Sequence, residues 1–286
     1  MKKVILVYIR IKKIKMNKTY IQSWIDIAIE DLEVSRILYE NKKYSNSFYH
    51  FQQASEKGLK AYAFMVKTYT SEKDAYKTGH YTLKVFVDSV NERQKEMAIL
   101  KDYEFDKVIG IENLDEYSNN LGSGLNSLPQ RKEIFEYSYE ILDEIIKTIS
   151  ELSEYNFELP NGFKEHLIDK MDLIFDLINK INPEKAEETR KEFNELLKDE
   201  KQLNDFIEFT KQHLNNTMVE YYYVLILYYS NLISHNHNNK SRYPEIDFNP
   251  LEYYNLNSPV IQKLPEFSRY LKSTLLQLKK WNDLVN

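Results

Sequence analysis

Apolar side chains recur at steps of three and four residues along most of this chain, the spacing that places them on one face of an α-helix. The pattern runs through residues 19–40 and again through residues 44–67, with Asn41 and two lysines between them. It returns from Leu83 to Val90. The spacing therefore predicts an antiparallel pair of helices and then a third helix, with the polar residues from 68 to 79 as a link.

The second half of the chain predicts further helices. Asn182-Pro183 has the form of an N-cap followed by proline at the first helical position. Ser127 and Gln130 are spaced as a capping box. An exposed face is expected where Glu187, Lys191 and Glu195 alternate in charge. We expect these helices over residues 130–152, 162–181, 183–207, 214–235 and, after Pro265, 265–283.

Composition supports an all-α protein and excludes several classes of function. Glycine occurs six times in 286 residues, and neither Gly-rich phosphate-loop motif is present. Cysteine is absent, which excludes disulfides, thiolate metal sites and a cysteine nucleophile. The net charge of -5 argues against a broadly basic nucleic-acid binder but permits a local basic patch. The fold class that we expect is therefore an all-α helical bundle.

Two apolar stretches bear on location. Residues 1–15 hold a short apolar run that ends in basic residues, without the cleavage site of a signal peptide. Residues 218–233 include Glu220 and many tyrosines, which favours a buried helix over a membrane span. We expect a cytoplasmic protein with no membrane contact.

A polar stripe on the helix of residues 44–67 holds the first candidate site. His50, Gln53, Lys57 and Lys60 follow one another at helical steps, with Glu56 among them. One interpretation is a solvent-facing side with a Glu56–Lys60 ion pair. The other is a cleft in which lysines bind phosphate and Gln53 binds a base or sugar edge.

Other chemistry finds little support in the sequence. The six histidines form no metal motif, so we expect no metal and no cofactor. His235 and His237 are two residues apart, a spacing that a helix would point to different sides. No G-x-S-x-G segment suggests a serine nucleophile.

Residues 24–64 resemble the first two helices of the HEPN family (higher eukaryotes and prokaryotes nucleotide-binding). The matching pattern begins with W-x3-A-x2-D-L and continues into the segment QQASEKGLKA. Further on, His80 and Leu83 resemble the start of the family's third helix, and the R-Y-P triplet at Arg242 resembles the family's ending after the fourth. The matched residues are Trp24, Ala28, Asp31, Leu32, Tyr44, Ser47, Gln52, Gln53, Ala54, Glu56, Lys57, Leu59, Lys60, Ala61, His80, Leu83, Arg242, Tyr243 and Pro244.

The resemblance implies a short antiparallel bundle that commonly homodimerises and binds nucleotides or RNA. Many members cleave RNA without a metal in defence or toxin–antitoxin systems, and many act beside a nucleotidyltransferase partner. Cleaving members carry an R-x4–6-H motif. No arginine of this chain stands four to six residues before a histidine.

The resemblance covers residues 18–92 and 215–250, which predicts a bundle divided by an insertion. We therefore expect an N-terminal extension, the first part of the bundle, a helical insertion, the last part of the bundle and a C-terminal helix. These segments are residues 1–17, 18–102, 103–214, 215–250 and 251–286.

Three hypotheses for function follow. The first is a catalytically degenerate HEPN protein that binds a nucleotide or RNA. The second is an RNase toxin that uses His235 or His237 with Arg242, and the third is a helical interaction scaffold. For the first, the phosphate ligands would be Lys57, Lys60 and Arg242, with further binding residues His50, Gln53, Glu56, His80 and Tyr243.

Overall fold

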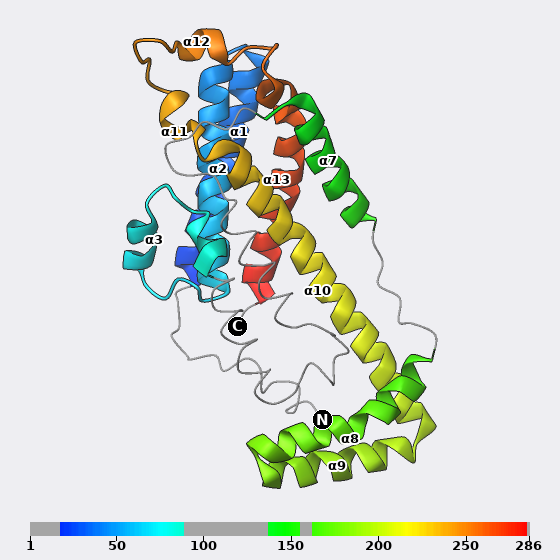
Figure 1. Ribbon diagram of the computed structural model, residues 1–286. Helices are drawn as coiled ribbons and strands as arrows, with labels where there is room; N and C mark the ends of the chain where they lie inside the picture. Colours follow the sequence, from blue (N-terminus) through cyan, green and yellow to red (C-terminus); the bar gives the residue numbers. More distant parts are fainter. Residues whose placement is uncertain (1–17, 89–136, 155–161, 285–286) are drawn as a thin grey trace. The chain divides into compact units, whose positions relative to one another are not determined.

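The computed structural model describes residues 18–88, 137–154 and 162–284 (Figure 1). Within these ranges all regular elements are α-helices, apart from an isolated bridge between Glu245 and Phe248. The expected all-α fold class is confirmed.

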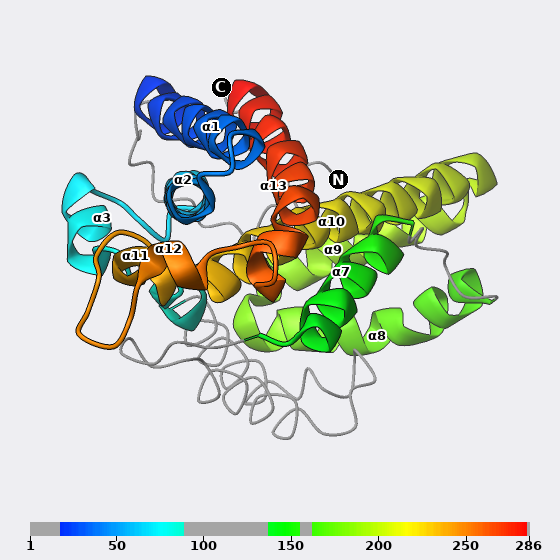
Figure 2. The same cartoon turned by 90° about the horizontal axis from the view of Figure 1, so that it is seen from above.

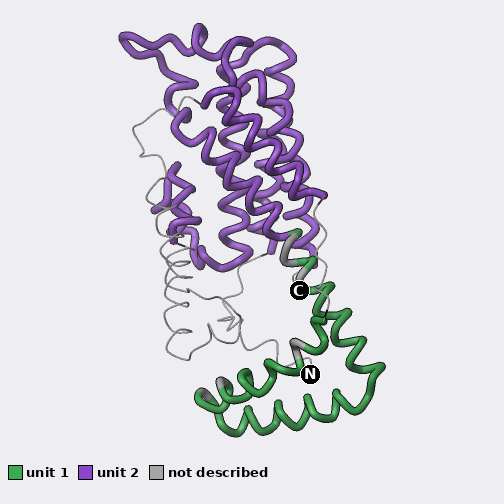
Figure 3. The backbone as a smooth tube through the Cα atoms, turned by 45° about the vertical axis from the view of Figure 1, so that its right-hand side comes forward, with its two compact units in different colours: residues 1–13, 90–126, 156–219 green, residues 14–89, 127–155, 220–286 purple. Residues whose placement is uncertain are grey.

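The chain forms two compact units (Figure 3). Residues 14–89, 127–155 and 220–286 belong to one, which we call the bundle unit. Residues 156–219 belong to the other, together with residues 1–13 and 90–126. The second unit contains α8 (Phe163–Ile181) and α9 (Pro183–Leu197), and α10 (Glu200–Ser234) contributes residues to both units. The bundle unit contains α1 (Lys18–Glu40), α2 (Tyr44–Met65), α3 (Glu72–Thr78), α7 (Tyr139–Ser153), α11 (His237–Lys240), α12 (Pro250–Tyr253) and α13 (Pro259–Leu284). The expected five-segment division of the chain stays a prediction.

Helix α2 is the central element of the bundle unit. It packs against α1, α13, α11 and α12, and the view along its axis shows these helices around it (Figure 2). Phe48, Phe51 and Leu59 are fully buried. At Gly58 an added Cβ would lie 2.7 Å from the Leu275 side chain and 3.3 Å from that of Leu227, so glycine permits the close approach of α13 and α10. Because other helices surround α2, some of its polar side chains are buried as well.

The second unit follows the sequence pattern closely. The side chain of Asn182 accepts a hydrogen bond from the Lys185 backbone N–H at 3.1 Å, and Pro183 opens α9, as expected. Its apolar cluster unites Phe175 of α8 with Phe193 and further residues. The charge run on the outer face of α9 is exposed, which confirms that prediction for Glu187, Lys191 and Glu195.

Several predicted boundaries are wrong. The polar link contains the short helix α3, where the Asp74 carboxylate accepts the Ser71 backbone N–H at 2.9 Å and Ala75 is buried. The helix expected over residues 183–207 breaks after Leu197, and α10 begins at Glu200 instead of residue 214.

Helix α13 begins at Pro259, earlier than the predicted start at residue 265, so Pro265 lies inside the helix. Proline removes one backbone donor, which normally disfavours a helix interior. Here Val260, Ile261 and Leu264 before the proline are buried on the same core as Phe267 after it. Tertiary packing of this continuous face outweighs the cost. The predicted capping box at Ser127 and the segment of residues 1–15 lie outside the described residues.

Candidate functional site

Helix α2 carries a buried ionic cluster around Glu56, which we call the Glu56 cluster (Gln52, Glu56, Lys60 and His80). The Glu56 carboxylate accepts hydrogen bonds from Lys60 Nζ at 2.8 Å, His80 Nδ1 at 2.9 Å and Gln52 Nε2 at 3.0 Å. The side chains of Glu56 and Lys60 are 5% and 9% exposed, whereas that of His80 is 56% exposed. The buried Glu56 carboxylate therefore accepts hydrogen bonds from three side chains.

The electrostatics of Glu56 reflect two opposed effects. Burial raises its pKa, but the charge and hydrogen bond of Lys60 and the hydrogen bond of His80 lower it more, so the pKa lies below its usual value. Lys60 Nζ also lies 5.5 Å from the centre of the Trp24 ring. The predicted Glu56–Lys60 ion pair is present, but the solvent-facing side on which one interpretation placed it is wrong.

A second ionic cluster joins α2 to α1, and we call it the Asp31 cluster (Asp31, His50 and Lys57). His50 Nδ1 lies 3.0 Å from Asp31 Oδ1, and Lys57 Nζ donates to Asp31 Oδ2. The side chains of Asp31, His50 and Lys57 are 14%, 29% and 22% exposed. Gln53 donates to the Gln52 side chain at 2.7 Å. Solvent therefore reaches this cluster.

Arg242 lies beside the Asp31 cluster, in the chain after α11. Its Nε donates to the Asn238 carbonyl at 3.1 Å, and Nη2 donates to the Asn239 side chain at 3.2 Å. The guanidinium carbon is 4.8 Å from the Tyr49 ring centre and 4.9 Å from that of Tyr243. Tyr49 in turn contacts the His50 ring at a centroid distance of 5.2 Å. Arg242 and His50 thus contact the same tyrosine.

His235 and His237 occupy a different environment. Their relative exposures are 6% and 1%. His237 Nδ1 shares a hydrogen bond of 2.8 Å with the Tyr254 hydroxyl, and its ring packs edge-on against Phe48 at 5.1 Å. Burial raises the pKa of Tyr254, so the phenol stays protonated. Both histidines are part of the core of the bundle unit.

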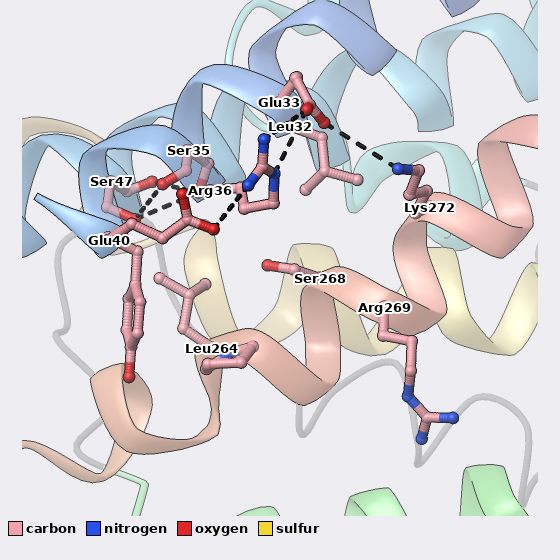
Figure 4. Close-up of a pocket in the computed structure, with 12 residues that line it drawn as sticks. Leu32, Glu33, Ser35, Arg36, Glu40, Ser47, Leu264, Ser268, Arg269 and Lys272 are labelled. Carbon is pink, nitrogen blue, oxygen red and sulfur yellow. Dashed lines mark hydrogen bonds and ion pairs between the residues drawn. The ribbon is translucent and has the colours of Figure 1, made fainter.

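A hollow of about 470 Å³ lies between α1 and α13, apart from these clusters (Figure 4). Its floor includes Leu32 and Leu264. At its rim Arg36 donates to Glu33 at 2.8 Å and to Glu40 at 2.5 Å. Arg269 and Lys272 also line the hollow, so it carries charges of both signs.

Two observations concern the described residues as a whole. Among the described residues, no three or more histidine, cysteine, aspartate or glutamate side chains come together in a way that suits a metal ion. No helix in the described ranges has the length and apolar character of a membrane span.

Sequence reasoning missed two residues that organise the site. Asp31 belongs to the W-x3-A-x2-D-L pattern, so its place in that pattern was an available signal. Tyr49 is one of 23 tyrosines and carries no such signal. The structure joins His50 and Lys57 to Asp31, and Tyr49 contacts both His50 and Arg242. Tyr243 lies against Arg242, and Glu56, Lys60 and His80 form a separate cluster.

These features define an all-α bundle whose central helix contributes residues to both ionic clusters. The model of the HEPN domain family matches residues 21–152, which confirms the resemblance seen in the sequence. The match continues through residues 103–152, which we had assigned to the insertion. No curated protein and no solved structure shows significant similarity to the chain.

Proposed function

We propose that this HEPN protein binds a nucleotide or RNA at one contact surface, formed by Tyr49, His50, Lys57, Arg242 and Tyr243. The observation that carries the proposal is the Arg242 guanidinium held between two tyrosine rings. A guanidinium binds phosphate oxygens, and bases stack on exposed aromatic rings and on guanidinium planes. Tyr243 is 57% exposed and is therefore available for stacking.

The residues expected from the sequence take different parts in this proposal. Lys57 is partly exposed and adds positive charge, although Asp31 balances it. Lys60 and Glu56 are buried against each other, so we assign them to holding α2 in place. His80 and Gln53 stay as candidate hydrogen-bonding groups, His80 being the more exposed.

The wider context is part of the same proposal and is supported by the family resemblance alone. It comprises a cytoplasmic, prokaryotic defence or toxin–antitoxin role, a homodimer and a nucleotidyltransferase-type partner. Because the chain lacks the R-x4–6-H motif of the cleaving members, we propose that it is catalytically degenerate with respect to that motif.

Fluorescence anisotropy with a labelled, 2′-O-methylated single-stranded RNA tests binding, and calorimetry with ATP and GTP tests free nucleotides. Losing a charge-assisted hydrogen bond costs about 1.5–3 kcal/mol, so Arg242→Gln should weaken binding about tenfold or more. It should also reduce the salt dependence by about 0.7, the slope of one phosphate contact on a single strand.

Arg190→Gln is the matched control, because Arg190 is also a partly exposed arginine over an aromatic ring, 5.1 Å from that of Phe175. It lies in α9 of the second unit. The proposal fails if neither RNA nor nucleotide binds. It also fails if both arginine variants weaken binding equally.

A further inference from the structure

The hollow between α1 and α13 has the size of a small-molecule site. Its volume of about 470 Å³ lies within the range of about 300–1,000 Å³ that is typical of ligand pockets. Both helices belong to the bundle unit, and Figure 4 shows the Ser268 side chain projecting from α13 into the space that faces α1. The hollow therefore has room for a whole small molecule.

The floor of the hollow favours an apolar group. Leu32 and Leu264 form it, and they are 5% and 2% exposed. Two serines also line the hollow, but their hydroxyl groups are already used. Ser35 Oγ donates to the Ser47 carbonyl at 2.8 Å, and Ser47 Oγ donates to the Ser35 carbonyl at 2.7 Å. Since these hydroxyl hydrogens serve the protein's own backbone, the two serines offer no donor to a polar ligand.

The rim of the hollow disfavours a ligand with several negative groups. Arg36 donates to the carboxylates of Glu33 and Glu40, and Lys272 Nζ lies 4.0 Å from Glu33 (Figure 4). Two carboxylates at the opening repel a chain of phosphates. The hollow is therefore unsuited to a nucleoside triphosphate.

Arg269 supplies the positive charge that these pairs leave over. It lines the hollow from α13, and among the described residues no carboxylate forms an ion pair with it. Its guanidinium carbon lies 4.5 Å from the Tyr270 ring centre. The N–H donors of a guanidinium lie in its plane, so a ring against its face leaves them open to an anion. Arg269 therefore suits one carboxylate or sulfonate at the rim.

We propose that the hollow binds a small amphipathic anion, a molecule with an apolar body and a single carboxylate or sulfonate. The apolar body packs on Leu32 and Leu264, and the acidic group binds Arg269. The hollow shares no residue with the contact surface of the proposed function and takes a different class of ligand. Neither proposal depends on the other.

Fluorescence titration of the purified full chain with anilinonaphthalene sulfonate, an apolar anion that brightens out of water, tests the site. We expect saturable binding at one site. Ser268→Phe places a ring in the hollow and should abolish that binding. Ser273→Phe is the matched control, because Ser273 is an exposed serine on the same helix and does not line the hollow. It should bind the dye as the unaltered chain does.

Competition against the dye tests the charge. Decanoate and decanol carry the same apolar chain, but only decanoate is an anion. Decanoate should displace the dye at least about tenfold more effectively, the factor expected of one charge-assisted hydrogen bond. Arg269→Gln should remove most of this preference. Arg190→Gln, which alters another arginine over an aromatic ring, should keep it.

Circular dichroism and urea denaturation check that each variant is folded. If Ser268→Phe does not fold, the competition with Arg269→Gln at its exposed position decides the question. The proposal is overturned if the native chain does not bind the dye, or if a folded Ser268→Phe binds it as Ser273→Phe does. It is also overturned if decanol competes as well as decanoate, or if both arginine variants change the preference equally.

Discussion

The Glu56 cluster and the Asp31 cluster combine the same kinds of charged side chain and both include a lysine of the central helix α2, yet their environments differ. Each joins a carboxylate to a lysine and a histidine. The Glu56 and Lys60 side chains are less than 10% exposed, whereas Asp31, His50 and Lys57 are between 14% and 29% exposed. Identical chemistry therefore serves the fold in one place and faces solvent in the other.

The difference follows from desolvation. A buried ion pair gains its Coulomb energy only after paying a large cost to leave water, so losing one partner leaves a costly unpaired charge. A pair that water reaches can exchange a protein partner for solvent at little cost. Stability should thus depend on the Glu56 cluster, and ligand binding on the Asp31 cluster.

The largest expected effect separates the two lysines. Lys60→Met leaves Glu56 buried without its cation and should lower the free energy of unfolding by about 3–5 kcal/mol. Lys57→Met leaves Asp31 with His50 and some water, and should cost about 1 kcal/mol. Urea denaturation of both variants measures the difference. A Lys57→Met effect as large as that of Lys60→Met would remove the contrast between the clusters.

An effect of intermediate size concerns how stability changes as the pH falls. The folded-state pKa of Glu56 is below its ordinary value of 4.5, so its contribution is complete above that value and is lost as the pH falls through the folded-state pKa. Glu56→Gln removes this contribution. The stability difference between the unaltered chain and the variant should therefore be constant near neutral pH and shrink below about pH 5.

Urea denaturation from pH 7 to pH 3 measures that difference. A difference that grows on acidification would show that the folded state binds the Glu56 proton more tightly than the unfolded chain, contrary to the geometry.

The smallest expected effect on stability concerns an exposed lysine, which serves as a reference for the two lysines of α2. Lys191→Met replaces a lysine on the solvated face of α9 and should change the free energy of unfolding by less than about 0.5 kcal/mol. The same denaturation experiment applies. A larger loss would mean that the exposure of a lysine does not by itself determine how much its substitution lowers the free energy of unfolding.

Much of the helical structure could be predicted from the sequence because its signals are local. The three-and-four spacing identified α1 and α2, and the Asn182-Pro183 pair identified the start of α9. The segment QQASEKGLKA identified the family. Pro265 misled the prediction, because a local breaker was outweighed by contacts with distant residues.

The candidate site was only partly predictable, because its parts come from distant segments. The sequence selected Lys57, Lys60 and Arg242 alike as phosphate ligands. It contained no signal that Asp31 pairs with Lys57, or that Tyr49 lies against Arg242. Those contacts depend on how α1 and the chain after α11 pack on α2.

The sequence by itself therefore determined an all-α chain, its resemblance to the HEPN family and the polar residues on α2. These properties depend on periodicity and on short motifs, which a single segment contains. Only the tertiary structure decided that Lys60 and His237 are buried while His50 and Arg242 reach solvent. Burial depends on which neighbours cover a helix face, and the helix's own sequence does not specify them.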